Sequence, residues 1–472
     1  MLPLQVFFFF PHIYIAGASP PHCIIFSSSG CANHWFLPIK IILPLFSFLL
    51  LFIFTYYIFT YSTSLSTLLP YLLSARLIGE MTSNIVIIGA SYSGLPAAHY
   101  LLKHAPESWT VTLINPSTNF YFNPAAPRAL VEQSILGKNN GDLFIPFLPK
   151  LEKHGSRFAF LHGKASVVDT NSRTVTVVLQ GGRGETSVTY DHLIIASGSN
   201  TSGGTGKEWG FKHAREGNTE EIVANTRAAI KAAKKIVISG AGATGVEFAG
   251  EIKDFYGAEK EVVIISASEE LLPQVPRADV GASARKILTK IGVKVKTGVR
   301  VVEERPATKG VEGVVELVLS SGEVLSADLH IATWGIYPNT SFLAKDLLDS
   351  SGWVNMDEYM RARGMQNVWA VGDVTHWGNR KLTTVDAQWT VAMENIVSSI
   401  NGGGVEVFKK YVHSDELLMI VPMGRKFGNA VAFVKGWKLW GVLGWLFKGR
   451  TFMIEFARPV AEGITTSGRA KI

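Results

Sequence analysis

Two glycine-rich turns constrain the fold of this chain more than any other feature. The first, Gly-Ala-Ser-Tyr-Ser-Gly at 89–94, follows the apolar run Ile-Val-Ile-Ile at 85–88 and precedes a helical pattern. The second, Gly-Ala-Gly-Ala-Thr-Gly at 240–245, follows the run Ile-Val-Ile-Ser at 236–239 in the same way. This order of strand, glycine turn and helix is what a dinucleotide-binding unit requires. Either turn alone could belong to any α/β protein, but the two together predict an α/β chain with two Rossmann-like domains.

The first turn departs from the usual pattern at two positions. Gly89 permits the tight turn and Gly94 lets helix and strand pack closely, but Ser91 replaces the middle glycine. The next strand pattern, WTVTLINP, ends at Asn115, where an acidic residue normally holds a ribose. Because an amide can still bond a hydroxyl, we predict that Gly89, Ser91, Gly94 and Asn115 contact the first dinucleotide.

The second turn has the complete pattern, with Gly240, Gly242 and Gly245. A pyrophosphate would lie at the positive end of the helix that starts near Gly242. The following strand pattern ends at Ser266. A carboxylate at this position would favour NAD by accepting a hydrogen bond from the 2′-hydroxyl and by repelling a 2′-phosphate. Ser266 does neither strongly, so both NADH and NADPH are admissible.

Composition excludes several classes of protein. A chain of 472 residues is too long for one compact core and favours two or three domains. Its only cysteines are Cys23 and Cys31, which excludes a disulfide-stapled scaffold, and 47% hydrophobic residues exclude intrinsic disorder. No pattern of metal ligands is present, so we expect no metal site.

The first 80 residues differ from the rest of the chain. They contain only three charged residues, Lys40, Arg76 and Glu80, and residues 41–60 carry no charge at all. Twenty uncharged residues span roughly 30 Å as a helix, enough to cross a bilayer. Residues 41–60 are therefore either a transmembrane anchor or part of an extension upstream of the true start, because the run MTSNIVIIGA at Met81 resembles the start of a nucleotide-binding fold.

Three further segments complete a known pattern: HLIIASG at 192–198, LHIATWG at 329–335, and NVWAVGD at 367–373. Together with the two turns they resemble the two-dinucleotide-binding flavoproteins, the family of glutathione reductase, type II NADH dehydrogenase and apoptosis-inducing factor. Residues 115–132, 265–274 and 418–436 resemble the AMID, or ferroptosis suppressor, branch of that superfamily. The resemblance covers nearly all of residues 81–472 and none of residues 1–80.

The resemblance implies the domain order. An FAD-binding domain would comprise residues 81–205 and 325–400, with an NAD(P)-binding domain inserted at 206–324. A C-terminal segment, 401–472, would close over the flavin, and residues 1–80 remain a hydrophobic extension. The implied cofactors are FAD and either NADH or NADPH. Oligomeric state is left open.

The resemblance also assigns site residues. Asp373, after Gly372, would accept hydrogen bonds from the flavin's ribityl chain. The turns that cross between the domains would contact the cofactors through Ala196, Ser197, Gly198 and Gly335.

Four charged or polar side chains are candidates for further roles near the flavin and the nicotinamide. Glu247 would approach the nicotinamide amide, or be an exposed helix carboxylate. Arg128 would hold the flavin pyrophosphate or ribityl region, or simply pair with a surface carboxylate. Lys381 would stabilise negative charge on the reduced flavin, or be a solvated loop lysine. Gln388 would begin a helix directed at the flavin O2 edge, or be a polar cap on a core helix.

The missing cysteines bear on the reaction. Disulfide reductases of this superfamily pass electrons from flavin to a cysteine pair, but residues 81–472 contain no cysteine. We therefore expect an FAD-dependent NAD(P)H oxidoreductase that passes electrons to a quinone-like acceptor. Two alternatives stay open: a flavin-bearing apoptosis or stress signalling protein that senses NAD(P)H, and a reductase of a small redox protein such as a ferredoxin.

Residues 434–450 suggest where a lipid-soluble acceptor would be met. Lys435, Lys438, Lys448 and Arg450 are interleaved with three tryptophans and a phenylalanine. This composition is typical of an interfacial membrane anchor, and the net charge of +7 has the matching sign. One alternative is that these aromatics are buried beside the flavin and the basic residues are ordinary surface. Nucleic acid is the weaker alternative, because no recognition motif is present. We expect a membrane-associated or cytoplasmic protein, for instance at the mitochondrial outer surface or on lipid droplets.

Overall fold

The structure is a computed structural model that describes residues 83–132, 143–201, 207–214, 218–307, 313–378, 380–466 and 471–472. The predicted transmembrane segment 41–60 lies outside these residues. Among the helices that are described, none has both the length and the apolar character needed to cross a membrane.

The first glycine turn lies in a large sheet with the strand order β18-β8-β1-β2-β5-β6-β7. Its strands are β1 (Ser83–Ile88), β2 (Trp109–Asn115), β5 (Phe158–Asp169), β6 (Thr174–Leu179), β7 (Glu185–Thr189), β8 (His192–Ile195) and β18 (Val368–Ala370). β1 pairs in parallel with β2 and β8, and β18 pairs in parallel with β8. The chain therefore leaves this sheet after β8 and returns to it at β18.

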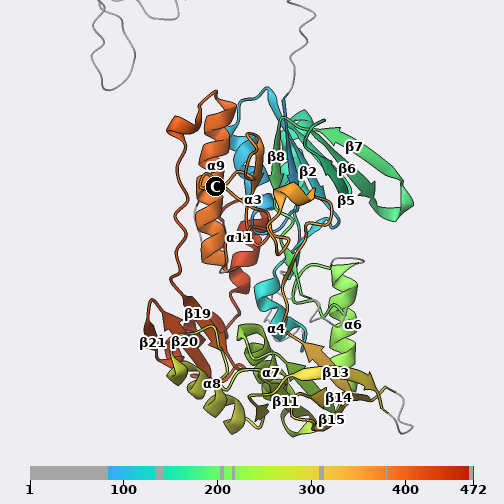
Figure 1. The fold of residues 1–472 in the computed structure, drawn as a ribbon, viewed down its shortest axis with the longest axis vertical. Helices are drawn as coiled ribbons and strands as arrows, with labels where there is room; N and C mark the ends of the chain where they lie inside the picture. The colour runs from blue at the N-terminus through green and yellow to red at the C-terminus, as the bar shows by residue number, and fades with distance from the viewer. Residues whose placement is uncertain are drawn as a thin grey trace, which may run out of the picture. The chain divides into compact units, whose positions relative to one another are not determined.

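Two helices from distant parts of the chain pack together beside this sheet, α3 (Gly94–His104) and α9 (Leu382–Ile400). They lie side by side in Figure 1. α9 buries Val385, Trp389, Ala392 and Ile396, the spacing of one helical face. The prediction that this helix begins at Gln388 is wrong, because Val385 already belongs to that face and no helix-breaking residue interrupts residues 382–387.

The second glycine turn lies in a four-stranded parallel sheet with the order β12-β11-β10-β16. Its strands are β10 (Lys235–Ser239), β11 (Glu261–Ile265), β12 (Lys294–Lys296) and β16 (Leu329–Ala332). The helices of this part are α6 (Thr219–Ala232), α7 (Ala243–Tyr256) and α8 (Ala278–Lys290). An antiparallel sheet is added by β13 (Val301–Pro306), β14 (Val315–Leu319) and β15 (Val324–Ala327). The fold is thus α/β with two Rossmann-like units, as predicted.

The two segments that connect these units run together. β9 (Ser199–Asn200) pairs in antiparallel fashion with β17 (Tyr337–Pro338). Next to this ribbon, the Ser197 hydroxyl donates to the Asn339 carbonyl at 2.7 Å, and the Asn339 amide donates to the Ser197 carbonyl at 2.9 Å. The outgoing and returning chains are therefore fixed to each other at one crossing point.

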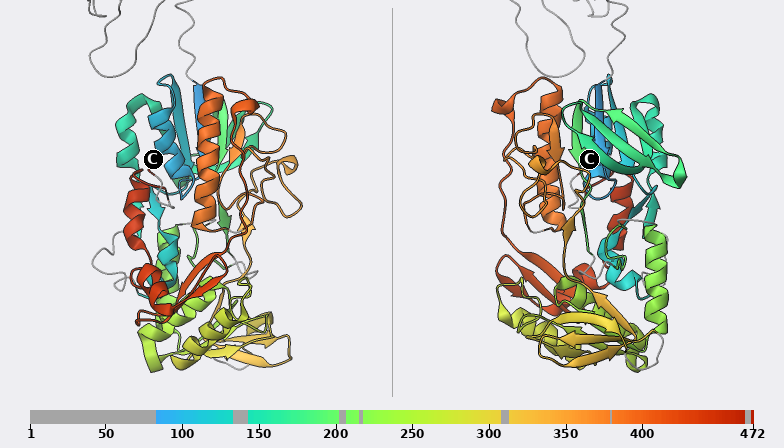
Figure 2. Two further views of the ribbon diagram at one scale, coloured as in Figure 1. Left: turned by 90° about the vertical axis from the view of Figure 1, so that its left-hand side faces the viewer. Right: turned by 45° about the vertical axis from the view of Figure 1, so that its right-hand side comes forward.

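The C-terminal segment forms a small antiparallel sheet, followed by short helices. These elements are β19 (Leu418–Pro422), β20 (Ala430–Val434), β21 (Trp437–Leu439), α10 (Gly441–Gly444), the π-helical turn η9 (Trp445–Gly449) and α11 (Ala457–Ala461). β19 packs on α7 and β20 on α8, whereas α11 reaches α3 (Figure 2). Gly250 of α7 leaves the space that the Met423 backbone occupies. That residues 401–472 close over the flavin stays a prediction.

Candidate functional site

The first glycine turn is shaped by two close backbone approaches. Gly89 has a φ of +103°, and a side chain there would collide with the Ala196 carbonyl. A side chain at Gly94 would collide with the Gly89 carbonyl. Ser91 lies half-buried between them, and α3 has no acidic residue in its first turn. The start of α3 is therefore open to an anion such as a pyrophosphate.

Asn115 lies beneath this turn, with both polar atoms of its side chain in use. Its Oδ1 accepts a hydrogen bond from the Ala90 amide at 2.9 Å, and its Nδ2 donates to the Ser117 carbonyl at 2.7 Å. The side chain therefore holds the glycine turn against the end of β2. A contact with a ribose stays a prediction.

The second turn has the same backbone geometry. Gly240 has a φ of +108°, and a side chain at Gly245 would collide with its carbonyl. Gly242 is the N-cap of α7, and the nearest atom to a side chain there would be Gln274 Nε2, 3.9 Å away. The open space in front of α7 fits a second pyrophosphate.

Ser266 is buried at the end of β11, where its hydroxyl donates to the Glu270 carbonyl at 3.1 Å. It also accepts from the Ser268 amide at 3.2 Å. The hydroxyl thus shapes the following turn, and the preference between NADH and NADPH stays open.

Gln388 fixes the turn that carries Asp373. From the second turn of α9 its Oε1 accepts from the Gly372 amide at 2.9 Å, while its Nε2 donates to Thr375 Oγ1 at 3.2 Å. Gly372 has a φ of +90° and lies against Ser93 of the first glycine turn. Gln388 acts as a buried polar cap in this structure, and a contact with the flavin stays a prediction.

Asp373 faces the crossing point between the two units. Its Oδ2 forms a short ion pair with Lys212 and accepts from the Ser199 hydroxyl at 3.1 Å. Lys212 is a site residue that the sequence analysis missed. It comes directly after the polar loop 199–211, and that position next to a predicted crossing was the available signal.

Lys381 is the residue that precedes α9, and its ammonium group is buried. Lys381 Nζ has no hydrogen-bond partner in the part of the chain that the structure describes. Burial lowers the pKa of this group. The solvated-loop alternative is therefore wrong. A buried, unpaired cation fits a site that takes an anionic group, as the predicted flavin contact requires.

Glu247 lies one turn into α7 and is 3% exposed, so the exposed-carboxylate alternative is wrong. Its Oε1 accepts from Lys448 Nζ of the C-terminal segment at 2.5 Å. Burial raises the pKa of Glu247 to about 7, against the opposing effect of Lys448. Lys448 is accordingly turned inward, which corrects its assignment as a lipid-facing cation.

Arg128 is fully buried and pairs with a second carboxylate of α7. Its Nε and Nη2 donate to the two oxygens of Glu251 at 2.7 and 2.9 Å. Further bonds run from its guanidinium to the carbonyls of Gly449 at 2.9 Å and Arg450 at 3.1 Å. The surface-carboxylate alternative is wrong, and the guanidinium is occupied by these partners. Its flavin role stays a prediction that these contacts do not support.

The remaining predicted residues lie at the crossing between the two units. The Ala196 amide donates to the Ile88 carbonyl at 2.9 Å, and Gly198 and Gly335 both have positive φ angles, of +68° and +76°. The structure therefore places Gly89, Ala196, Gly198 and Asp373 around one junction. Glu247 and Gly242 belong to the separate turn of the second sheet.

The chain is similar to proteins of known class. Residues 83–395 match the family described as pyridine nucleotide-disulphide oxidoreductase. Oxidoreductase ptaL of Pestalotiopsis fici is 35% identical over 334 residues, which cover 69% of this chain and 86% of the relative. Human ferroptosis suppressor protein 1 is 29% identical over 386 residues, 79% of this chain and 94% of that protein.

Solved structures share the fold. NDH2 from Plasmodium falciparum in complex with NADH has a TM-score of 0.60 at 15% identity, covering 80% of this chain and 98% of that one. The sulfide:quinone oxidoreductase of Aquifex aeolicus has a TM-score of 0.59 at 19% identity, covering 81% and 92%. The open glycine turns and the unpaired Lys381 fit the cofactors of such proteins. The chain belongs to the pyridine nucleotide-disulphide oxidoreductase family and has FAD and NAD(P)H as its cofactors.

Proposed function

We propose that this oxidoreductase takes a hydride from NAD(P)H onto FAD and passes the electrons to a quinone-like acceptor without a redox disulfide. One observation carries the proposal. The residues that match a disulphide oxidoreductase family, 83–395, contain no cysteine. Electrons on a bound flavin therefore have no cysteine pair in this region to move to, and a small external acceptor can take that place.

The side chains of the protein have positioning and electrostatic roles in this proposal. Bound FAD supplies the redox chemistry, since it accepts a hydride and releases electrons singly or in pairs. The two glycine turns hold the phosphates, and Asp373 offers an acceptor toward the polar chain of the flavin. Lys381 places a buried positive charge where negative charge develops. No general base is needed, because hydride transfer depends mainly on close placement of the two rings.

Anaerobic stopped-flow on the flavin-loaded protein tests the proposal. We expect NADH or NADPH to bleach the flavin rapidly and a short-chain ubiquinone to restore its colour rapidly. A test variant is Gly242→Val, which fills the open space before α7, where Gln274 Nε2, at 3.9 Å, is the nearest described atom beyond the glycine's own helix and chain neighbours. This variant should bind flavin but resist bleaching. Bleaching without reoxidation by quinone would refute the acceptor and favour a small redox protein or a signalling role.

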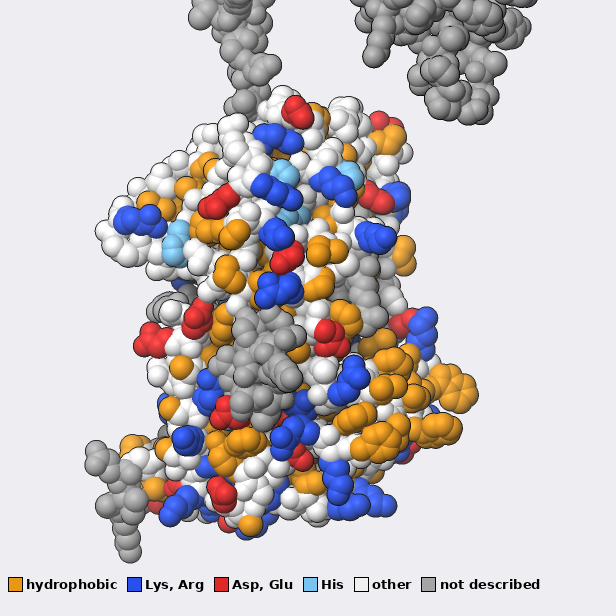
Figure 3. Space-filling view, turned by 180° about the vertical axis from the view of Figure 1, so that it is seen from behind, with side chains coloured by type: hydrophobic (Ala, Val, Ile, Leu, Met, Phe, Trp, Pro, Cys, Tyr) orange, Lys and Arg blue, Asp and Glu red, His pale blue; other side chains and the backbone are white. Residues whose placement is uncertain are grey.

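The proposal extends to the site of reaction, a membrane surface. Phe427, Trp437, Trp440, Leu446 and Phe447, here called the aromatic edge, are 49–81% exposed. Figure 3 shows hydrophobic side chains gathered on this face, with Lys and Arg side chains beside them. Exposed tryptophans next to cations are typical of interfacial membrane contact, and a membrane is where quinones dissolve.

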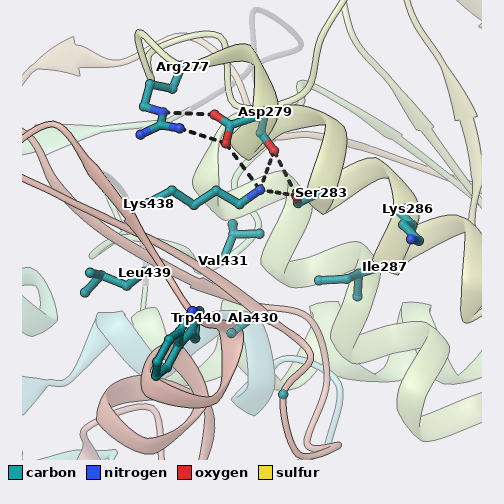
Figure 4. A pocket seen from close by; sticks show the side chains of 12 residues that line it. Arg277, Asp279, Ser283, Lys286, Ile287, Ala430, Val431, Lys438, Leu439 and Trp440 are labelled. Atoms are coloured by element: carbon teal, nitrogen blue, oxygen red, sulfur yellow. Dashed lines mark hydrogen bonds and ion pairs between the residues drawn. The ribbon is translucent and has the colours of Figure 1, made fainter.

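A groove of about 550 Å³ adjoins the aromatic edge, between α8 and the strands β20 and β21. Figure 4 shows Arg277 and Lys438 converging on Asp279 at one side of this groove, and Trp440 at the other. Lys438 Nζ also donates to Ser283 Oγ at 2.6 Å. Because these cations are already paired, we place the main lipid contact on the aromatic edge.

A further inference from the structure

We propose that the groove beside the aromatic edge binds one acidic phospholipid, with its phosphate among the cations of the groove and an acyl chain directed toward Trp440. The inference rests on the proposed function in one respect, since a membrane at the aromatic edge would supply the lipid. It adds a binding site and a lipid of defined charge, which exposed aromatic rings alone do not select.

The groove lies where the C-terminal sheet packs on α8 of the second unit. Its volume of about 550 Å³ is within the usual range of small-ligand sites, about 300–1,000 Å³. Ile287 of α8, with Val431 and Leu439 of the sheet, supplies apolar lining. Figure 4 shows Val431 and Ile287 between the charged side chains and Trp440. The groove therefore has a charged end and an apolar path that leads away from it.

The charged end of the groove carries an excess of positive charge. Arg277 binds both oxygens of Asp279 at 3.0 Å, and Lys438 lies 3.4 Å from the same carboxylate. Two cations thus share one carboxylate, and Lys286 adds a third positive charge to the lining. An anionic group in the groove is favoured because it offsets this surplus, and a concave wall of one charge sign concentrates the attraction.

Lys438 is fixed in direction by its contacts within the protein. Its Nζ donates to Ser283 Oγ at 2.6 Å and to the Asp279 carbonyl at 2.9 Å. Both acceptors belong to the first two turns of α8, so β21 and this helix are joined at the charged end. A cation that is already held in place loses little conformational entropy when it binds an anion. This favours a specific contact over a diffuse attraction.

The neighbouring surface indicates that the anion belongs to a lipid. Trp440 lines the groove and is also part of the aromatic edge, where it is 81% exposed. An acyl chain that starts at the charged end would pass Val431 and Ile287 and leave the groove among exposed aromatic rings. A free phosphate would use only the charged end, and an uncharged lipid only the apolar path. An acidic phospholipid matches both parts.

Isothermal titration calorimetry on the flavin-loaded full-length protein tests the site, with dihexanoyl phosphatidic acid kept below its micelle concentration. We expect saturable binding of one lipid per chain, and much weaker binding of inorganic phosphate and of dihexanoyl phosphatidylcholine. Lys286→Glu should weaken binding about tenfold or more, since it replaces an attractive charge by a repulsive one. Lys290→Glu is the matched control, because it makes the same change one turn along α8, at an exposed residue that does not line the groove.

Four outcomes would overturn the inference. Equal weakening by Lys286→Glu and Lys290→Glu would mean that the lipid responds to overall surface charge and not to the groove. Equal affinity for inorganic phosphate would mean that the site takes a free phosphate, and equal affinity for phosphatidylcholine would mean that the cations have no role. Absence of saturable binding would mean that the groove holds no lipid. Turnover of NAD(P)H with a short-chain ubiquinone in solution tests the proposed function separately, and its absence beside intact lipid binding would contradict that function alone.

Discussion

The unpaired ammonium group of Lys381 gives a prediction at the scale of one residue. Replacing Lys381 by Met removes a buried positive charge without removing a hydrogen bond, since Nζ has no partner among the described residues. If this charge stabilises the reduced flavin, its loss makes reduction harder. We expect the two-electron midpoint potential to fall by about 30 mV, a tenfold change in the equilibrium constant. Dye-equilibrated photoreduction of the two proteins would measure it.

Lys381→Arg is the control, because it keeps the charge at nearly the same length of side chain. It should leave the midpoint potential within a few millivolts of the original, apart from effects of the bulkier group. An unchanged potential in Lys381→Met would show that the ammonium lies away from the flavin and that the assignment is wrong.

The carboxyl of Glu247 gives a second prediction at this scale, about stability. Burial raises its pKa from 4.5 to about 7, so the folded state holds this proton more tightly than the unfolded chain does. Its contribution to the free energy of unfolding is then fully present below about pH 4.5 and lost as pH rises through 7. Glu247→Gln cannot titrate. Its stability relative to the original protein should increase by about 3 kcal/mol across that window.

Urea unfolding of the coenzyme-free protein at several pH values would measure this difference. The ion pair with Lys448 exists only while Glu247 is ionised, and its effect is already contained in the pKa of about 7. A difference that does not vary between pH 4.5 and 7 would show that Glu247 is ionised in the fold at all these values.

Sequence patterns predicted the residues whose chemistry is local and missed those whose partners are distant. Gly89, Gly240 and Asp373 were predicted because a turn or the end of a strand defines each of them. The contacts of Lys212 and Lys448 were not predicted. Lys212 pairs with a carboxylate 161 residues away, and Lys448 pairs with one 201 residues away. Charge alone indicates that a lysine needs solvent or a partner, but not which carboxylate the fold brings near it.

At the scale of elements, α4 (Ala126–Ala129), α7 and η9 meet at the buried pair of Arg128 and Glu251. Arg128→Met would leave the Glu251 charge buried without its guanidinium partner. Removal of one member of a buried pair typically costs 3–5 kcal/mol, so we expect a loss of about 4 kcal/mol in the free energy of unfolding. Chemical denaturation followed by tryptophan fluorescence would measure it, because several tryptophans lie in the C-terminal segment.

Arg425 and Asp254 provide a matched control, since they join α7 to the same C-terminal segment. Their contact is 3.0 Å long, but the Arg425 side chain is 48% exposed. Solvent screens such a pair, and Arg425→Met should cost less than about 1 kcal/mol. Equal losses in the two variants would show that burial of Arg128 contributes nothing beyond the ion pair itself.

Elements were predicted well where periodicity and turn chemistry act together. The strands and helices beside both glycine turns match their predicted places within a few residues. The start of α9 was missed because its first turn, Leu-Thr-Thr-Val, carries little periodic signal. The segment that forms the small sheet β19–β21 was identified only through the resemblance. Its position against α7 depends on Gly250, because any side chain there would collide with the C-terminal segment, and no local sequence pattern predicts such a contact.

At the scale of the whole molecule, the sequence predicted two nucleotide-binding units joined by two crossings. That the C-terminal segment closes over the flavin stays a prediction, and its packing on α7 and α8 was not predicted because it depends on contacts between distant surfaces. The observed packing places the aromatic edge on the segment that supplies Lys448 to α7. A membrane contact and the coenzyme turn would therefore be connected through one short stretch of chain, residues 437–448.

Binding to lipid vesicles tests that contact. Residues 82–472 form one compact unit, so they can be studied without the hydrophobic extension. Trp437 and Trp440 are 73% and 81% exposed, and changing both to Ser removes apolar area without disturbing the core. Each buried aromatic ring contributes about 1.5–3 kcal/mol, so we expect at least about tenfold weaker binding to phosphatidylcholine vesicles containing phosphatidylserine.

Val412→Ser, at a residue that is 82% exposed outside the aromatic edge, should bind like the original. Equal binding of all three proteins in sedimentation assays would place the lipid contact elsewhere, and weak binding by all three would mean that this part of the chain meets its acceptor in solution.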